Sequence, residues 1–118
     1  MDIKSTQKRI HAFADERNWD QFHNPKNLAM ALSVECSELV EVFQWLSHEE
    51  ASNIKHDPDK MNQISDEIAD VMVYLLRLAD KLGVDIEKAI DSKMKKNARK
   101  YPVEKVHGSA KKYTGYKD

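Results

Sequence analysis

The chain has 118 residues, a formal net charge of −1 and a pI of about 6.5. Without a strong basic field, the composition argues against a nucleic-acid polymer as partner. A hydrophobic content of 41% with only three Gly and three Pro favours a helical protein over a many-turned β architecture. Its one cysteine, Cys36, cannot form an internal disulfide, and no apolar run reaches the length of a membrane span. We therefore expect one compact, cytoplasmic, all-α domain with no membrane partner.

The first half of the chain has the pattern of two helices joined by an aromatic loop. Apolar residues at helical spacing predict a helix over residues 2–17, namely Ile3, Ile10, Phe13 and Ala14. The loop over residues 18–24 contains Trp19, Phe22 and His23. Asn24 and Pro25 then supply an N-cap and a first-turn proline for a second helix over residues 25–46.

The second half continues with one short and two long helical segments. Residues 47–50, with the sequence Ser-His-Glu-Glu, form a capping-box pattern that opens a short helical piece. A third long helix is expected over residues 57–82, and Gly83 is its expected stop. Asp85 caps a fourth helix that ends before Pro102.

The last residues of the chain show no helical period. Residues 103–118 are polar and aperiodic, which predicts an extended or partly disordered arm. We therefore predict a helical domain over residues 1–102 and a C-terminal arm over residues 103–118.

Two pairs of carboxylates lie on the inward stripes of the second and third helices. Glu35 and Glu38 are three residues apart, as are Glu67 and Asp70, so each pair shares one helix face. No Lys or Arg lies on those stripes, and core-facing carboxylates are costly unless they are paired or bound to metal. A hard divalent cation such as Mg²⁺ is the natural partner. The alternative is a set of solvated or salt-bridged helix carboxylates.

An apolar run surrounds almost the whole circumference of the third helix. Residues 71–76 have the sequence Val-Met-Val-Tyr-Leu-Leu. Such a helix is either central in its fold or buried by another subunit. Because one small bundle rarely surrounds a helix completely, we expect a homo-oligomer.

A basic face is expected on the fourth helix. Lys93, Asn97 and Lys100 follow one another at the spacing of a single helix face. They form either a solvated basic face near the helix C-terminus or a clamp for phosphate groups.

Aromatic residues near the second helix also allow two interpretations. Trp19 and His23 lie in the loop before that helix, and Trp45 lies at its end. Such side chains can stack on a nucleobase. Equally, they can close the ends of a helical bundle.

Taken in order along the chain, these features resemble the MazG-type all-α nucleoside triphosphate pyrophosphohydrolases. The pattern is Glu35-x-x-Glu38, then 28 residues, then Glu67-x-x-Asp70. The likeness is strongest to the short single-domain branch, of the integron-borne and dCTP pyrophosphatase type, and includes residues 17–28, 43–47, 65–80 and 92–114. Larger MazG enzymes often carry a further Glu where this chain has Val34, and the short branch also lacks it.

The resemblance implies a four-helix MazG-type bundle that assembles as a dimer of dimers, with sites built from more than one subunit. It implies Mg²⁺, with Mn²⁺ as a substitute, held by Glu35, Glu38, Glu67 and Asp70. It implies phosphate binding by Lys93, Asn97, Lys100 and Tyr101. It also implies that the base is enclosed by Trp19, His23 and Trp45.

The implied reaction is (d)NTP + H₂O → (d)NMP + PPi, a house-cleaning activity on dCTP or on related or modified nucleotides. Glu38 or Glu41 would accept the proton of the attacking water. Two alternatives stay open. The first is a sister enzyme that acts on phosphoribosyl-ATP or dUTP, and the second is a non-catalytic helical oligomerisation or regulatory module.

Overall fold

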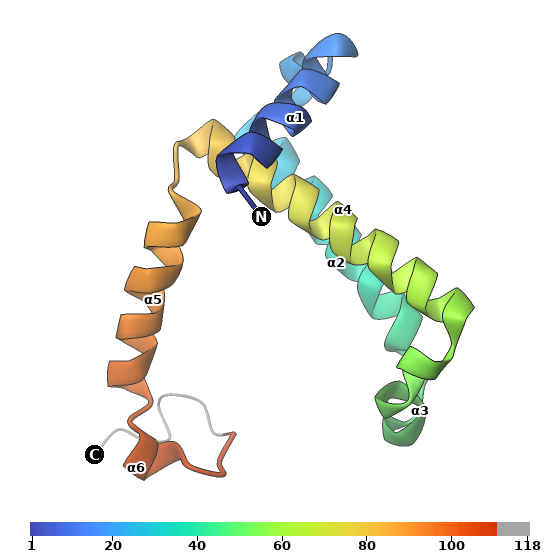
Figure 1. Cartoon of the computed structure of the whole chain (residues 1–118), viewed down its shortest axis with the longest axis vertical. Helices are drawn as coiled ribbons and strands as arrows, with labels where there is room; N and C mark the ends of the chain where they lie inside the picture. Colours follow the sequence, from blue (N-terminus) through green and yellow to red (C-terminus); the bar gives the residue numbers. More distant parts are fainter. Residues whose placement is uncertain (111–118) are drawn as a thin grey trace. The chain divides into compact units, whose positions relative to one another are not determined.

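The structure is a computed structural model that describes residues 1–110, and regular structure in that part of the chain is helical throughout (Figure 1). The all-α prediction is therefore confirmed. The long helices are α1 (Ile3–Glu16), α2 (Pro25–Phe43), α4 (Pro58–Leu82) and α5 (Ile86–Lys100). The short elements are η1 (Asp20–Phe22), α3 (His48–Ser52), η2 (Ile54–His56) and α6 (Val103–Val106).

The contacts within the chain define two compact units, Met1–Gly83 and Val84–Asp118. The first unit holds α1, α2 and α4, and the second holds α5 and α6. The contact boundary thus follows Gly83, whereas the sequence placed a division between residues 102 and 103. That predicted division stays a prediction.

The first unit is an antiparallel pair of long helices with a third helix laid against it. α2 and α4 run side by side in opposite directions, and α3 and η2 connect them (Figure 1). α1 packs against α4, where the Gln7 side-chain amide Nε2 donates a hydrogen bond to the Leu76 carbonyl oxygen over 3.0 Å. This arrangement places the two carboxylate-bearing helices next to each other.

The helices α1 to α5 begin after side-chain caps that can be recognised in the sequence. An acceptor side chain before each of the helices α1 to α5 bonds the backbone N–H three residues further on, which satisfies a donor that the helix itself leaves unpaired. These caps are Asp2, Asn24, Ser47, Asp57 and Asp85. Gly83 ends α4 in the left-handed conformation, at φ 68°, which glycine adopts without strain.

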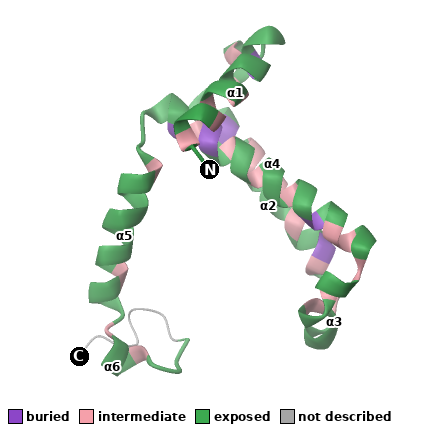
Figure 2. Ribbon diagram, viewed as in Figure 1, coloured by how far each residue is buried: buried purple, intermediate pink, exposed green. Residues whose placement is uncertain are grey.

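The buried core of the first unit is small. Leu28 and Leu76 are fully buried, and Ala14, Val42, Ile64 and Ala79 join them. Buried positions are scattered along α2 and α4, and much of both helices is exposed (Figure 2). Large apolar side chains remain exposed there, including Met30, Val34, Val40, Ile68, Met72 and Leu75. The predicted apolar run at residues 71–76 is thus only partly covered within one chain.

The C-terminal segment differs from the extended arm that the sequence predicts. Residues 103–106 form the short helix α6, which begins directly after Pro102. Pro102 occupies the N-cap position in an extended conformation, with φ −62° and ψ 138°, and the helical turn follows it despite the weak apolar pattern. Residues 111–118 of the predicted arm lie outside the described residues. No helix among the described residues is long and apolar enough to cross a membrane.

Candidate functional site

Three of the predicted metal ligands meet between α2 and α4. Glu35 and Glu38 from α2 and Glu67 from α4 each place one carboxylate oxygen within 4.8 Å of the others. All three residues are half-buried. The i,i+3 spacing puts the first two on one face of α2, and the antiparallel packing brings the third opposite them. We call this group the carboxylate trio.

Two oxygen atoms of the carboxylate trio lack the partners that buried polar atoms need. Oε2 of Glu35 and Oε2 of Glu67 are buried, and neither has a hydrogen-bond partner among the described residues. A buried acceptor without a partner is costly, and native structures contain few of them. Three carboxylates from two rigid helices form the all-oxygen donor set that a hard divalent cation prefers. The trio is therefore suited to hold such a cation.

The electrostatics of the trio also favour a bound cation. Burial raises the pKa of the Glu35 carboxyl, and hydrogen bonding to Glu38 and repulsion from Glu38, Asp70 and Glu67 raise it further. The pKa of Glu67 is raised by burial first, then by Glu38, Asp70 and Asp66. Like charges held this close disfavour one another's ionisation. Among the described residues, the groups that act on the pKa of Glu35 and Glu67 are all acidic, so full ionisation of the cluster is unfavourable.

Asp70, the fourth predicted ligand, lies at the edge of this cluster. It is exposed and outside the carboxylate trio, although its charge acts on both Glu35 and Glu67. Asp70 also lines a cavity of about 190 Å³ that is shared with α1 and the η1 loop. Its place as a ligand stays a prediction.

This cavity contains two of the three predicted base-binding residues. Its walls include Phe13, Trp19, His23, Tyr74 and Arg77. The Trp19 ring meets the Phe13 ring edge to face, with 5.8 Å between the ring centroids. Pockets that enclose whole drug-sized ligands span about 300–1,000 Å³. The volume here therefore fits one ring system of a ligand rather than a whole nucleotide.

Comparison with known proteins places this geometry in a family. Residues 30–115 match the MazG-like family, and this segment contains all four predicted metal ligands. The chain belongs to the MazG-like family. It is 45% identical over 108 residues to dCTP pyrophosphatase 1 of Rattus norvegicus and 43% identical to that of Homo sapiens. Each alignment covers 91% of this chain but 64% of the relative, so the chain spans slightly less than two thirds of the length of these relatives.

A solved structure shares the fold. A pyrophosphatase from Archaeoglobus fulgidus superposes with a TM-score of 0.80 at 38% sequence identity. The superposition covers 86% of this chain and 94% of that chain. The MazG-type helical fold expected from the sequence is therefore confirmed.

The third predicted base-binding residue of the MazG-like chain lies elsewhere. Trp45 follows the C-terminus of α2 and is 87% exposed, whereas Trp19 precedes its N-terminus. The 19 residues of α2 make a helix about 28 Å long at 1.5 Å per residue, and the two tryptophans lie beyond its opposite ends. One chain therefore does not bring Trp45 to the cavity that contains Trp19.

The predicted phosphate-binding residues belong to the second unit. Lys93 is exposed and Asn97 is half-buried on α5, and Tyr101 caps the C-terminus of that helix. Lys100 precedes this cap as the last residue of α5. Their common helix face is as predicted from the spacing. Their role in binding phosphate stays a prediction, as does that of Glu41, an exposed residue of α2, in catalysis.

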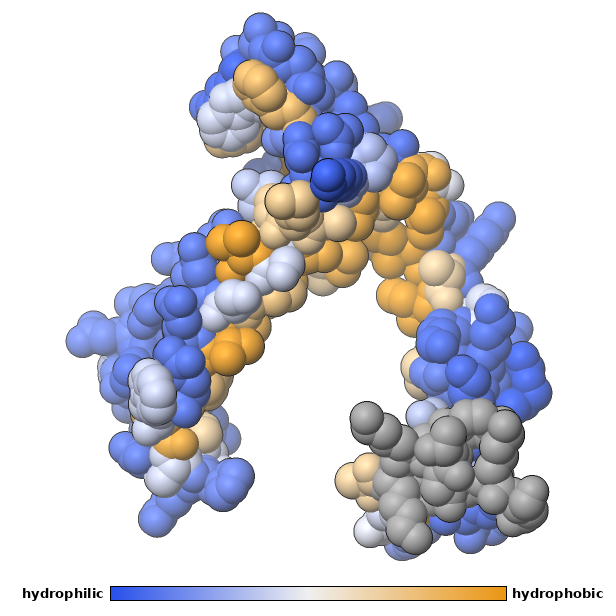
Figure 3. Space-filling view, turned by 180° about the vertical axis from the view of Figure 1, so that it is seen from behind, coloured by the Kyte–Doolittle hydropathy of each residue, from blue (hydrophilic) through white to orange (hydrophobic). Residues whose placement is uncertain are grey.

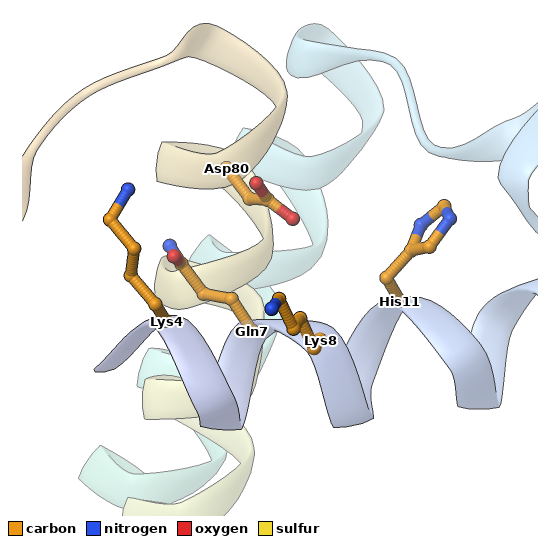
Figure 4. Close-up of a pocket in the computed structure, with 5 residues that line it drawn as sticks. All are labelled: Lys4, Gln7, Lys8, His11 and Asp80. Atoms are coloured by element: carbon orange, nitrogen blue, oxygen red, sulfur yellow. The ribbon is translucent and has the colours of Figure 1, made fainter. Parts of the chain in front are cut away.

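A network of side chains is centred on Arg77 and was not predicted from the sequence. This side chain is only 2% exposed, and it bonds His11, Asp20 and His23. A charged residue inside the apolar run Leu75-Leu76-Arg77-Leu78-Ala79 was the available signal, because arginine is rarely buried without partners. His11 also lines a second hollow, of about 380 Å³, with Lys4, Gln7 and Lys8 of α1 and Asp80 of α4 (Figure 4).

Proposed function

We propose that this MazG-like chain is a Mg²⁺-dependent nucleoside triphosphate pyrophosphohydrolase. The reaction is (d)NTP + H₂O → (d)NMP + PPi, and the expected substrates are dCTP or related or modified deoxynucleotides. The observation that carries the proposal is the carboxylate trio with its two unpartnered buried oxygens. The names of the relatives, dCTP pyrophosphatase 1 and a pyrophosphatase, support the same chemistry.

The metal site of the proposal consists of Glu35, Glu38, Glu67 and Asp70. When bound, Mg²⁺, or Mn²⁺ in its place, neutralises phosphate charge, polarises phosphorus and lowers the pKa of a water molecule. The carboxylates would hold that cation, because without it their negative charge would repel the phosphate chain. Glu38, within the trio, is the first candidate to accept the proton of the attacking water, and Glu41 on the same helix is the second.

The rest of the substrate would be held by residues outside the trio. The ring of the base enters the cavity beside Trp19 and His23, next to Asp70. Lys93, Asn97 and Lys100 of α5, with Tyr101 at its C-cap, hold the phosphates, and the two lysines neutralise charge that develops on the departing pyrophosphate.

The proposal includes a homo-oligomer, because Trp45 cannot close the same cavity from within one chain. A second copy would supply Trp45 to the Trp19 cavity. The exposed apolar side chains of α2 and α4 offer the surface for such an assembly, and Figure 3 shows hydrophobic groups gathered along these helices. Apolar patches of this kind mark interfaces between subunits. By resemblance, the assembly is a dimer of dimers.

A nucleotide panel tests the activity. The protein with millimolar Mg²⁺ is mixed with dCTP, dTTP, dATP, dGTP, dUTP and phosphoribosyl-ATP, and products are followed by phosphorus NMR. We expect NMP and PPi, with loss of turnover in Glu38→Gln, which removes one charge at nearly constant shape. Glu49→Gln, at an exposed position of α3 outside the site, is the matched control and should keep wild-type turnover.

Three results would contradict the proposal. Release of orthophosphate and NDP would indicate attack at another phosphorus and a different enzyme class. Full activity of Glu38→Gln would remove the carboxylate trio from the mechanism. Absence of products from every nucleotide would favour the alternative, a non-catalytic oligomerisation module.

A further inference from the structure

Arg77 of α4 is a buried guanidinium group with partners on α1 and on the segment of η1. Its Nη1 lies 2.8 Å from Nδ1 of His11, on α1. Its Nε donates to Nδ1 of His23 over 3.2 Å, and its Nη2 donates to Oδ1 of Asp20 over 2.7 Å. Lys81, one turn further along α4, also pairs with Asp20. One side chain thus links α4 to α1 and to the η1 loop.

The chemistry of arginine decides the protonation of both histidines. A guanidinium group has five N–H donors and no acceptor, and it stays charged in proteins. Nδ1 of His11 and Nδ1 of His23 must therefore each accept a hydrogen bond and carry no proton. A neutral imidazole has its proton on the other nitrogen. Both rings are accordingly held as the Nε2–H tautomer.

This constraint acts at the wall of the cavity described above. His23 and Arg77 both line the cavity together with Trp19 and Asp70. Because Nδ1 of His23 is engaged by Arg77, the nitrogen left for a ligand is Nε2, which can only donate. A ligand group that meets it must be an acceptor, such as a carbonyl oxygen or an unprotonated ring nitrogen.

We propose that Arg77 is a positioning residue that sets base specificity by locking His23 as an Nε2–H donor at this cavity. This inference rests on the proposed function and adds to it the rule by which the base is read. Cytosine offers an acceptor at N3, where thymine carries N–H. A fixed donor that meets ring position 3 therefore favours cytosine over thymine, whereas a histidine free to exchange tautomers could present either a donor or an acceptor.

The electrostatic surroundings keep His23 neutral. Burial lowers the pKa of the His23 ring, the charges of Arg77 and Lys81 lower it further, and Asp20 opposes them. His11 on α1 faces the same guanidinium group, and Asp70 lines the same cavity. The donor state of Nε2 is thus a property of the neutral ring and not of a histidinium ion.

The tautomers can be read without any substrate. Nitrogen-15 NMR of the histidine rings in the ligand-free protein distinguishes a protonated from an unprotonated nitrogen. In the wild type we expect Nδ1 unprotonated and Nε2 protonated for both His11 and His23. In Arg77→Met, which removes the donors at similar volume, we expect a mixture of tautomers. The proposal is overturned if wild-type His23 carries its proton on Nδ1, or if Arg77→Met leaves both tautomers unchanged.

Kinetics then connect the tautomer to the base. The ratio of kcat/KM for dCTP to that for dTTP should move about five- to tenfold toward one in Arg77→Met, with most of the change in KM, as expected for one net hydrogen bond. Arg77→Lys retains the positive charge but replaces the planar guanidinium donors with one ammonium group. It should restore part of the preference for dCTP over dTTP. Lys81→Met is the matched control, because it removes a cation bonded to Asp20 but touches neither ring. It should keep both the tautomers and the ratio.

The outcomes separate this inference from the proposed function. A wild-type protein without PPi release contradicts the proposed function, while the NMR result still decides the tautomer lock. An active wild type whose base ratio is unchanged in Arg77→Met overturns the specificity role alone. An equal change of the ratio in Lys81→Met also overturns it, because charge near the loop, and not the tautomer, would then set the preference.

Discussion

Replacing Glu35 by Gln should stabilise the metal-free protein and weaken its response to metal. The substitution keeps the shape of the side chain and removes one charge of the carboxylate trio. Two like charges 4.8 Å apart repel by about 0.9 kcal/mol in the dielectric of water, which already discounts for solvent screening. Glu35 is repelled by two neighbours, and added salt weakens this repulsion. We therefore expect the substitution to raise the free energy of unfolding by about 1 kcal/mol. For a unit of the size of Met1–Gly83, this raises the Tm by about 6 °C.

Metal should reverse the order of the two proteins. A cation at 100 times its Kd stabilises the native state by about 2.7 kcal/mol. If the lost ligand weakens binding tenfold, the gain for Glu35→Gln falls to about 1.4 kcal/mol. The assay is thermal unfolding followed by circular dichroism, in chelator and in millimolar Mg²⁺. Glu41→Gln, exposed on the same helix and outside the trio, should behave like the wild type in both conditions.

Two results would refute this reasoning. A lower Tm of Glu35→Gln in chelator would mean that the carboxylate makes a stabilising contact and is not repelled by its neighbours. An identical Mg²⁺-induced shift in both proteins would mean that Glu35 is not a ligand.

Three further predictions concern pH, phosphate and assembly. In chelator, the raised pKa values of Glu35 and Glu67 give stability that is complete below pH 4.5 and is lost as the pH rises through the raised values. The Tm of the wild type should therefore fall toward neutral pH relative to that of a variant with both Glu35→Gln and Glu67→Gln, and parallel Tm curves of the two proteins would contradict this. Lys93→Ala should lower kcat for dCTP more than it raises KM, because charge develops on the leaving pyrophosphate; wild-type kcat would make α5 a scaffold. Mixed and re-annealed Trp19→Ala and Trp45→Ala chains should recover part of the activity that each lacks alone; no recovery would mean that one chain builds the whole base site.

Local signals explain how much of the fold could be predicted. Side-chain acceptors before each helix, as at Asn24 and Asp57, act within three residues and are therefore visible in the sequence. The same holds for Gly83, whose left-handed conformation ends α4. The carboxylate trio was predictable as well, because Glu35 and Glu67 sit on apolar stripes where an unpaired charge has a cost.

Long-range pairings explain what could not be predicted. Arg77 meets His11 and His23 across 66 and 54 positions of sequence, and no local period encodes such contacts. The separation of Trp19 from Trp45 follows from the straight course of α2, which the aromatic pattern alone does not express. α6 was missed because a helix of 4 residues is too short to show an apolar period.

The loop that carries Trp19 is tied down along its whole length. The Trp19 backbone N–H donates to the Ala14 carbonyl oxygen, and the Asn27 side-chain amide donates to the Phe22 carbonyl oxygen. The Asp20 carboxylate accepts a hydrogen bond from Arg77. A ligand ring that enters beside Trp19 meets a wall that is already ordered. Little conformational entropy is then lost on binding, so more of the contact energy becomes affinity. The wall is thus preorganised for binding. We expect ligand exchange to be governed by diffusion and desolvation and not by folding of the loop.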